Sequence, residues 1–354
     1  MVHQGGSCMQ DFKKALVASV SLLLCAVLFC LVIIEPSMHS EQYSYYDSKA
    51  RSAMSGNINY IFNGASHLQT GVNVSIIDKK LNCNSYNLSG SAISWCGRVA
   101  LLKEEIDRNP VETVVIELSY NTFSRYDKIE GDLRVIPRLN TIAKRVQFLF
   151  ENTNPSSFNT ILGYLLSDGK KWWKDTLLGN SNDMEMDYEN KGYVYTEPED
   201  LTVQSKDVCE KYNSSSLSLD FKNDNIDDFN EMVRLCKDRN IDIKFIIIPV
   251  SDNMIWEFDN WDEFYDKMVS IVENVDGELY DFNLLKSRYV LFNDKESFRD
   301  TQHMSKSGAV TFSETYCEIM KKIDSGEDVS NMFYSTYSEM KSDSPYMKIY
   351  RSQQ

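Results

Sequence analysis

Two segments that lie far apart in the chain carry the residue types of a serine-dependent site. Gly64, Ala65 and Ser66 form a turn that places a hydroxyl directly after an apolar run, and Asp300 precedes His303 by three residues. A serine hydroxyl is a weak nucleophile until an imidazole removes its proton, and a carboxylate orients that imidazole. Ser66, His303 and Asp300 are therefore candidates for nucleophile, base and orienting acid.

A serine that attacks an ester also needs hydrogen-bond donors for the oxyanion that forms. The backbone N–H groups of Ser66 and Gly90 and the side-chain amide of Asn121 are candidates, and Gly90 permits close approach because it has no Cβ. Each residue also has a simpler interpretation. Serine and asparagine are common in turns, and the spacing of Asp300 and His303 also occurs at helix caps. Their order along the chain and their position beside predicted strands favour the catalytic interpretation.

The elements that must position these residues alternate between short β-branched runs and longer helical patterns. This alternation is typical of an α/β domain with a parallel sheet, in which the loops after the strands converge at one edge. The predicted strands are 59–62, 85–88, 113–118 and 243–248. Apolar residues at helical spacing predict crossover helices over 91–108 and 226–239. We therefore expect a three-layer α/β/α sandwich with a mainly parallel sheet.

An uncharged apolar run near the N-terminus, Ala15 to Ile34, is long enough to cross a membrane as one helix. Lys13 and Lys14 precede it and Glu35 follows it, which predicts a cytoplasmic N-terminus and an extracellular or periplasmic C-terminal domain. A cleaved signal peptide is the alternative, but the run exceeds the usual length of about 7 to 15 residues and no small-residue cleavage site follows it. We expect a single-pass anchor in the cell membrane.

The rest of the chain divides into a stalk, a large domain and a tail. Between residues 123 and 220 the α/β pattern breaks, and we interpret this stretch as an insertion or lid. It contains Trp172 and Trp173, which could stack on sugar rings, pack internally or anchor a membrane edge. The expected organisation is a cytoplasmic tail (1–14), the anchor (15–34), a stalk (35–56), the α/β domain (57–325) and a C-terminal tail (326–354).

The charge and cysteine content exclude some functional classes. The formal net charge of −15 argues against a nucleic-acid partner, which needs a basic surface. The eight cysteines include no C-x-x-C pair, so no zinc site is expected. A disulfide between Cys83 and Cys96 and buried free thiols remain alternatives.

In the order of its motifs, the chain resembles the SGNH (GDSL-like) hydrolase superfamily. The block with the nucleophilic serine matches residues 64–66, although Ala65 replaces the usual aspartate. The glycine block maps to Gly90, the asparagine block retains only Asn121, and the block Asp-x-x-His followed by Gly-Ala maps to residues 300–309. With its apolar N-terminal helix, the chain is most similar to the membrane-anchored branch that includes the D-alanyl lipoteichoic acid transfer protein and alginate O-acetylation proteins.

This resemblance implies a flavodoxin-like sheet and an extracytoplasmic O-acyltransferase or acyl esterase without a cofactor. The substrate would be a cell-surface polysaccharide or another envelope polymer, modified through an acyl-serine intermediate. In such systems a polytopic membrane-bound O-acyltransferase passes acyl groups across the membrane, and the anchor is a candidate docking element for one.

Two further functional classes stay open at this point. The departures from the family motifs at Ala65 and around Asn121 are compatible with a non-catalytic SGNH-like protein that binds or assembles a polymer. A sensor or adhesin with an α/β domain would be favoured if Asp300 and His303 lay far from the first strand.

Overall fold

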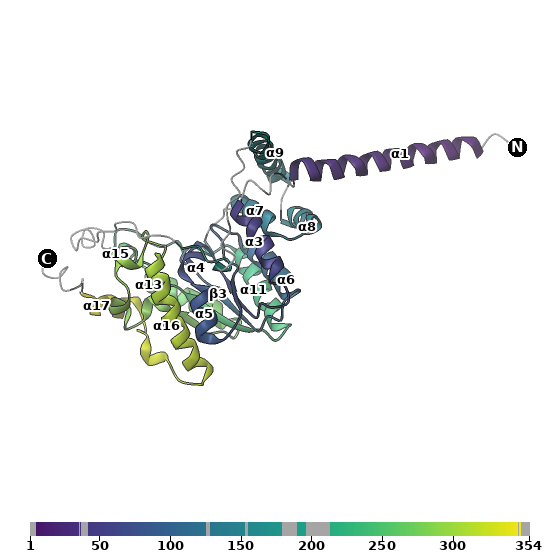
Figure 1. Cartoon of the computed structure of the whole chain (residues 1–354). Helices are drawn as coiled ribbons and strands as arrows, with labels where there is room; N and C mark the ends of the chain where they lie inside the picture. Colours follow the sequence, from purple (N-terminus) through teal and green to yellow (C-terminus); the bar gives the residue numbers. More distant parts are fainter. Residues whose placement is uncertain are drawn as a thin grey trace. The chain divides into compact units, whose positions relative to one another are not determined.

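The computed structural model describes residues 5–34, 36, 42–124, 128–152, 155–178, 190–195, 213–345 and 347 (Figure 1). The chain forms two compact units. One combines Met1–Lys49 with Ile136–Met186, and the other combines Ala50–Val135 with Asp187–Gln354. We describe each unit by itself and call the second the α/β unit.

The α/β unit is built on a five-stranded parallel sheet with the order β2-β1-β3-β4-β5. This is the flavodoxin-like order that the resemblance implied. The strands are β1 (Tyr60–Asn63), β2 (Ser85–Asn87), β3 (Thr113–Glu117), β4 (Asp242–Ile247) and β5 (Leu279–Asp281). The first four match the sequence predictions to within one residue at each end, whereas β5 was not predicted.

Helices cover both faces of this sheet, which confirms the three-layer arrangement. On one face α16 packs against α4 and α5, and Phe62, Val115 and Ile246 point into the apolar core beneath them. On the other face α6 packs against α11, and the ring of Phe229 lies 5.7 Å from that of Phe245 in β4. Neighbouring residues of one strand face opposite sides, so the buried pairs Ile61 and Phe62 in β1 and Val114 and Val115 in β3 supply apolar side chains to both faces.

The helices of the α/β unit include the two that were predicted, at α6 and α11. Those that pack around the sheet or carry the site are α4 (Ser66–Gly71), α5 (Val74–Leu81), α6 (Trp95–Ile106), α7 (Lys128–Val135), α11 (Asn223–Lys237), α13 (Trp261–Glu273) and α16 (Lys306–Asp324). Shorter ones are α12 (Asp252–Glu257), η4 (Phe282–Leu284), α14 (Arg288–Leu291), α15 (Asp294–Ser297), η5 (Ser330–Met332) and α17 (Tyr337–Asp343).

The other unit holds the apolar N-terminal helix. Among the described residues, Phe12–Ile33 is the one helical stretch long and apolar enough to cross a membrane. It belongs to α1 (Gly5–Phe29), which continues into a short π-helix, η1 (Cys30–Ile34). The remaining elements are η2 (Ile136–Arg138), α8 (Ile142–Asn152) and α9 (Pro155–Leu177), and α3 (Gln42–Ala53) runs across the boundary between the units.

Two regions contain structure where the sequence suggested a connection or a tail. The stalk region contains α3, and the region after residue 325 contains α17, whose Tyr337 is buried and donates a hydrogen bond to Asp281 at 2.6 Å. Cys83 and Cys96 are both free thiols, so the disulfide considered between them is absent.

Candidate active site

The first part of the site is the turn that follows β1. Ser66 is the first residue of α4, and the backbone N–H of Ala65 donates to Oε2 of Glu117 at 3.0 Å. Gly64 lies against the same side chain. A Cβ at Gly64 would come within 2.8 Å of Glu117 and of Leu68, so glycine is the residue that allows this close approach. The turn therefore holds Ser66 against the end of β3.

The second part is the loop between α15 and α16. An isolated antiparallel bridge between Phe298 and Met304 closes this loop at its base. Within it, Oδ1 of Asp300 accepts the backbone N–H groups of Gln302 and His303, each at 2.8 Å. These bonds fix the carboxylate beside the ring of His303.

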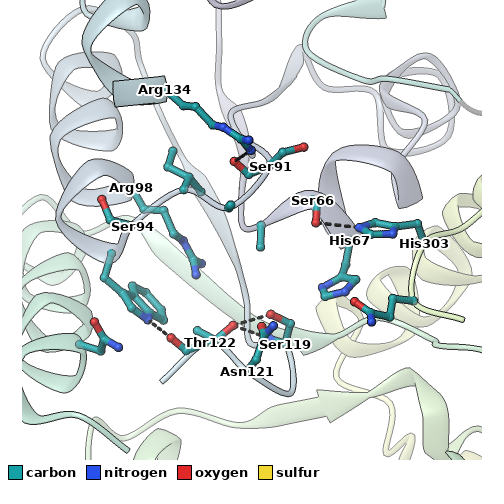
Figure 2. A pocket seen from close by; sticks show the side chains of 16 residues that line it. Ser66, His67, Ser91, Ser94, Arg98, Ser119, Asn121, Thr122, Arg134 and His303 are labelled. Atoms are coloured by element: carbon teal, nitrogen blue, oxygen red, sulfur yellow. Dashed lines mark hydrogen bonds between the residues drawn. The ribbon is translucent and has the colours of Figure 1, made fainter. Parts of the chain in front are cut away.

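The two parts meet to form the predicted triad, as Figure 2 shows for Ser66 and His303. Nε2 of His303 lies 2.8 Å from Oγ of Ser66, and Nδ1 lies 2.9 Å from Oδ2 of Asp300. If Nδ1–H donates to the carboxylate, Nε2 is left to accept the hydroxyl proton of the serine. This is the hydrogen-bond order that nucleophile activation requires.

Asp300 is suited to remain ionised. Burial raises the pKa of its carboxyl, but the hydrogen bonds from the ring of His303 and from the backbone of Gln302 and His303 outweigh burial and lower the pKa to about 2. The side chains of His303 and Asp300 are 25% and 38% exposed, so solvent and a substrate can reach them.

The two other predicted residues differ in their placement. Asn121 lines the same pocket as Ser66 and His303. The backbone N–H of Gly90 donates to the carbonyl of Gly64 at 3.3 Å. The hydrogen bond from the N–H of Gly90 to Gly64 would have to break before this N–H could donate to an oxyanion.

Beneath the triad lies a buried polar layer, and the sequence reasoning did not find two of its members, Arg98 and Glu117. Nε of Arg98 donates to Oδ1 of Asn63 at 2.9 Å, and its Nη2 donates to the carbonyls of Asn63 and Glu117. The ring of His67 stacks on that of His303 with 5.1 Å between the centroids, and its Nδ1 lies 3.8 Å from Oε1 of Glu117. The sign of this layer in the sequence was Glu117, a charged residue at the end of a predicted apolar strand.

Burial sets the charge of this layer. It lowers the pKa of His67 to about 3, an effect reinforced by the neighbouring His303, so His67 is neutral at ordinary pH. Burial also raises the pKa of Glu117, although the guanidinium of Arg98 opposes this. Arg98 itself keeps its charge, because burial lowers its pKa only to about 10. A neutral His67 places no second positive charge against the ring of His303 when that ring takes up a proton.

A pocket of about 290 Å³ opens beside the triad (Figure 2). Ser66 and His303 line it together with Trp95, Arg98 and Arg134. Arg134 donates to the carbonyl of Ser91 at 2.7 Å. None of the described residues that line the pocket is acidic, so its fixed charge is positive. No cluster of metal-ligating residues occurs within the described ranges.

A five-stranded parallel sheet in flavodoxin-like order, with a serine after β1 and Asp-x-x-His before the last long helix, is the architecture of an SGNH-type α/β protein. The chain belongs to the DltD protein family, because that family's model matches residues 102–321, more than half of its length. The matched part contains Asn121, Asp300 and His303, and Ser66 lies before it.

Among solved structures, a chain titled "The structure of a putative platelet activating factor from Streptococcus pneumonia" is 11% identical and aligns with a TM-score of 0.38 over 84% of this chain and 99% of its own. No curated protein matches the chain.

Proposed function

We propose that this protein is an extracytoplasmic serine-dependent O-acyltransferase that modifies a polymer of the cell envelope. The hydrogen-bonded series from Ser66 through His303 to Asp300 is the observation that carries the proposal. Membership of the DltD family supports the polymer class, since the family is implicated in the D-alanylation of teichoic acids at the cell surface.

The reaction proceeds in two acyl transfers. His303 takes the hydroxyl proton of Ser66 while Oγ bonds to the carbonyl carbon of an acyl donor, and the leaving alcohol then departs with that proton. An acceptor hydroxyl next gives its proton to His303, attacks the acyl-serine and releases Ser66 with its own proton restored. Hydrolysis is the same sequence with water as the acceptor.

The oxyanion of each step requires donors near Ser66. The backbone N–H of Ser66 and the side-chain amide of Asn121 are the proposed donors, because both residues line the pocket. The N–H of Gly90 joins them only if its bond to Gly64 opens.

The remaining features favour transfer to a charged polymer. Arg98 and Arg134 give the pocket wall a positive charge, which suits an anionic acceptor. The apolar helix Phe12–Ile33 fits a membrane anchor, which keeps the enzyme beside a membrane-bound acyl donor. A polytopic membrane-bound O-acyltransferase is the proposed source of the acyl group.

Labelling of the full chain with a fluorophosphonate probe tests the nucleophile. We expect labelling of the unaltered protein and its loss in the Ser66→Ala variant, with Ser91→Ala, which alters another serine at the pocket wall, as the matched control. A chain that stays unlabelled, and whose Ser66→Ala variant still supports polymer modification in cells, would instead be a polymer-binding or assembly protein.

A further inference from the structure

The long helix α9 lies against the end of the apolar N-terminal helix, within the same compact unit. Figure 1 shows α9 beside the end of α1 where η1 follows. Nε1 of Trp173 donates to the carbonyl of Val32 at 2.9 Å. Gly169 faces the backbone of Ile33, where a Cβ would lie 3.0 Å from the carbonyl oxygen. These contacts fix α9 at the point where the membrane span Phe12–Ile33 ends.

On this helix a row of apolar side chains is exposed. Leu166, Trp173 and Leu177 are seven and four residues apart, so they share one face, and they are 43%, 38% and 79% exposed. Leu178, directly after the helix, is 61% exposed. Gly169, which is buried against Ile33, lies three residues after Leu166 and four before Trp173, so these side chains border the face of α9 that contacts η1. The exposed row, defined as Leu166, Trp173, Leu177 and Leu178, keeps a large exposed apolar surface beside that contact.

Three lysines accompany the exposed row. Lys170 and Lys174 lie next to it on the helix surface, Lys171 lies further round, and all three are exposed. The acid Asp168 lies on the side opposite to the row, according to helical spacing. An apolar stripe that contains tryptophan and is bordered by lysine is the pattern of a helix that lies in a membrane interface.

We propose that α9 lies in the surface of the membrane that α1 spans, with its exposed row among the lipids and its lysines on anionic head groups. Lipid is the proposed partner of the exposed row, because the hydrogen bond between Trp173 and Val32 holds the row at the depth where the membrane span ends. This inference rests on the membrane span and not on the chemistry of Ser66.

Quenching by brominated lipid tests the proposal in the full chain. The anchor contains no tryptophan, and Trp95, Trp256 and Trp261 are buried in the α/β unit, so Trp172 and Trp173 are the fluorophores expected to meet lipid. In nanodiscs of brominated phosphatidylcholine, we expect lower emission than in discs of the ordinary lipid. The variant Trp172→Phe/Trp173→Phe should lose this difference, and the matched control Trp256→Phe should keep it.

A second measurement addresses the lysines. In discs that contain phosphatidylglycerol, backbone hydrogen exchange across α9 should be slower than in phosphatidylcholine alone. The variant Lys170→Gln/Lys171→Gln/Lys174→Gln should lose this response and keep its fluorophosphonate labelling at Ser66. Equal emission in both lipids would overturn the proposal, as would quenching that persists in the double tryptophan variant. The exposed row would then be assigned to a protein partner. A failure of labelling in the unaltered chain would count against the proposed enzyme alone.

Discussion

At the scale of single residues, the site separates into an accessible layer, which contains the proposed triad, and a buried polar layer beneath it. Ser66 and His303 line the pocket, and the side chain of Asp300 is 38% exposed beside them. Glu117 is fully buried, and Arg98 is 3% exposed at the pocket wall. Glu117 accepts the N–H beside the nucleophile, and Arg98 keeps the ends of β1 and β3 together. A buried charge is stable only when it is paired or hydrogen-bonded, so this layer is sensitive to substitution.

Replacing the orienting acid should affect the rate more than the fold. In Asp300→Asn, an amide takes the place of the carboxylate beside Nδ1 of His303, so the ring is no longer held in the tautomer that accepts a proton from Ser66. We expect the rate of acyl-ester turnover to fall by about 10⁴-fold if Asp300 acts as in known triads. The measurement is hydrolysis of an activated acyl ester. Glu314→Gln, at an exposed carboxylate on α16, should keep the unaltered rate, and equal rates in both variants would remove Asp300 from the triad.

His67 should make the protein less stable in acid. The unfolded chain protonates this ring near the ordinary pKa of 6.5, whereas the folded chain does so only near 3. Between these values the unfolded state binds more protons, so the free energy of unfolding decreases as the pH falls from 6.5 towards 3. Denaturant titrations at several pH values should show a slope smaller by up to about 1.4 kcal/mol per pH unit in His67→Gln. Parallel pH profiles for the two proteins would contradict the burial of a neutral ring.

The sequence indicated the proposed triad better than the residues that support it. Ser66, Asp300 and His303 stand out because of their order along the chain and their position beside predicted strands. Glu117 and Arg98 were missed because charged residues are normally at the surface, and no local pattern distinguishes the rare buried pair. Their burial depends on contacts between β1, β3 and α6, which only the tertiary structure provides.

At the scale of elements, the position of His303 depends on the contacts that hold the loop between α15 and α16 in place. The N–H of Ser305 donates to the carbonyl of Ser297 at 3.0 Å, and Ser305 also caps α16 by accepting from the N–H of Gly308. Gly308 lies directly over Ser297. A Cβ at this glycine would come within 1.9 Å of the Ser297 carbonyl oxygen.

The variant Gly308→Ala should therefore displace the histidine loop. We expect it to lose about 1 to 3 kcal/mol of stability, because overpacking forces a backbone shift, and to label more slowly with a fluorophosphonate. Thermal unfolding and labelling rate are the two measurements. Gly163→Ala is the matched control, since nothing lies within 4 Å of its Cβ position on α9, and it should be neutral or slightly stabilising. An unchanged labelling rate in Gly308→Ala would show that the close contact between Gly308 and Ser297 does not position His303.

One strand of the sheet, β5, was not predicted from the sequence. The edge strand β5, Leu279–Asp281, is three residues long and contains a buried aspartate. Its pairing with β4 depends on residues that are distant in the sequence, which no local pattern indicates. The longer strand β3 contains the β-branched run 113–116, β4 contains isoleucine at positions 243, 246 and 247, and both strands were predicted from these residues.

At the scale of the whole molecule, the charge distribution around the anchor predicts the orientation of the protein. Lys13 and Lys14 precede the apolar stretch, so we expect the N-terminus inside and the α/β unit outside. Protease added to intact cells should digest the α/β unit and spare an N-terminal tag, while a cytoplasmic marker stays intact. The variant Lys13→Glu/Lys14→Glu should reduce this bias. A tag that is digested in the unaltered chain would reverse the assignment.

The distance in sequence between the proposed nucleophile and its proposed base also sets when the site can form. Ser66 and His303 are 237 positions apart, and they meet only once α16 has docked on α4 and α5. A chain still emerging from the ribosome or threading through an export channel therefore has an ordinary, unreactive serine. The proposed acylation would then begin only after folding, so a chain that is still being synthesised or exported would not react with cytoplasmic esters.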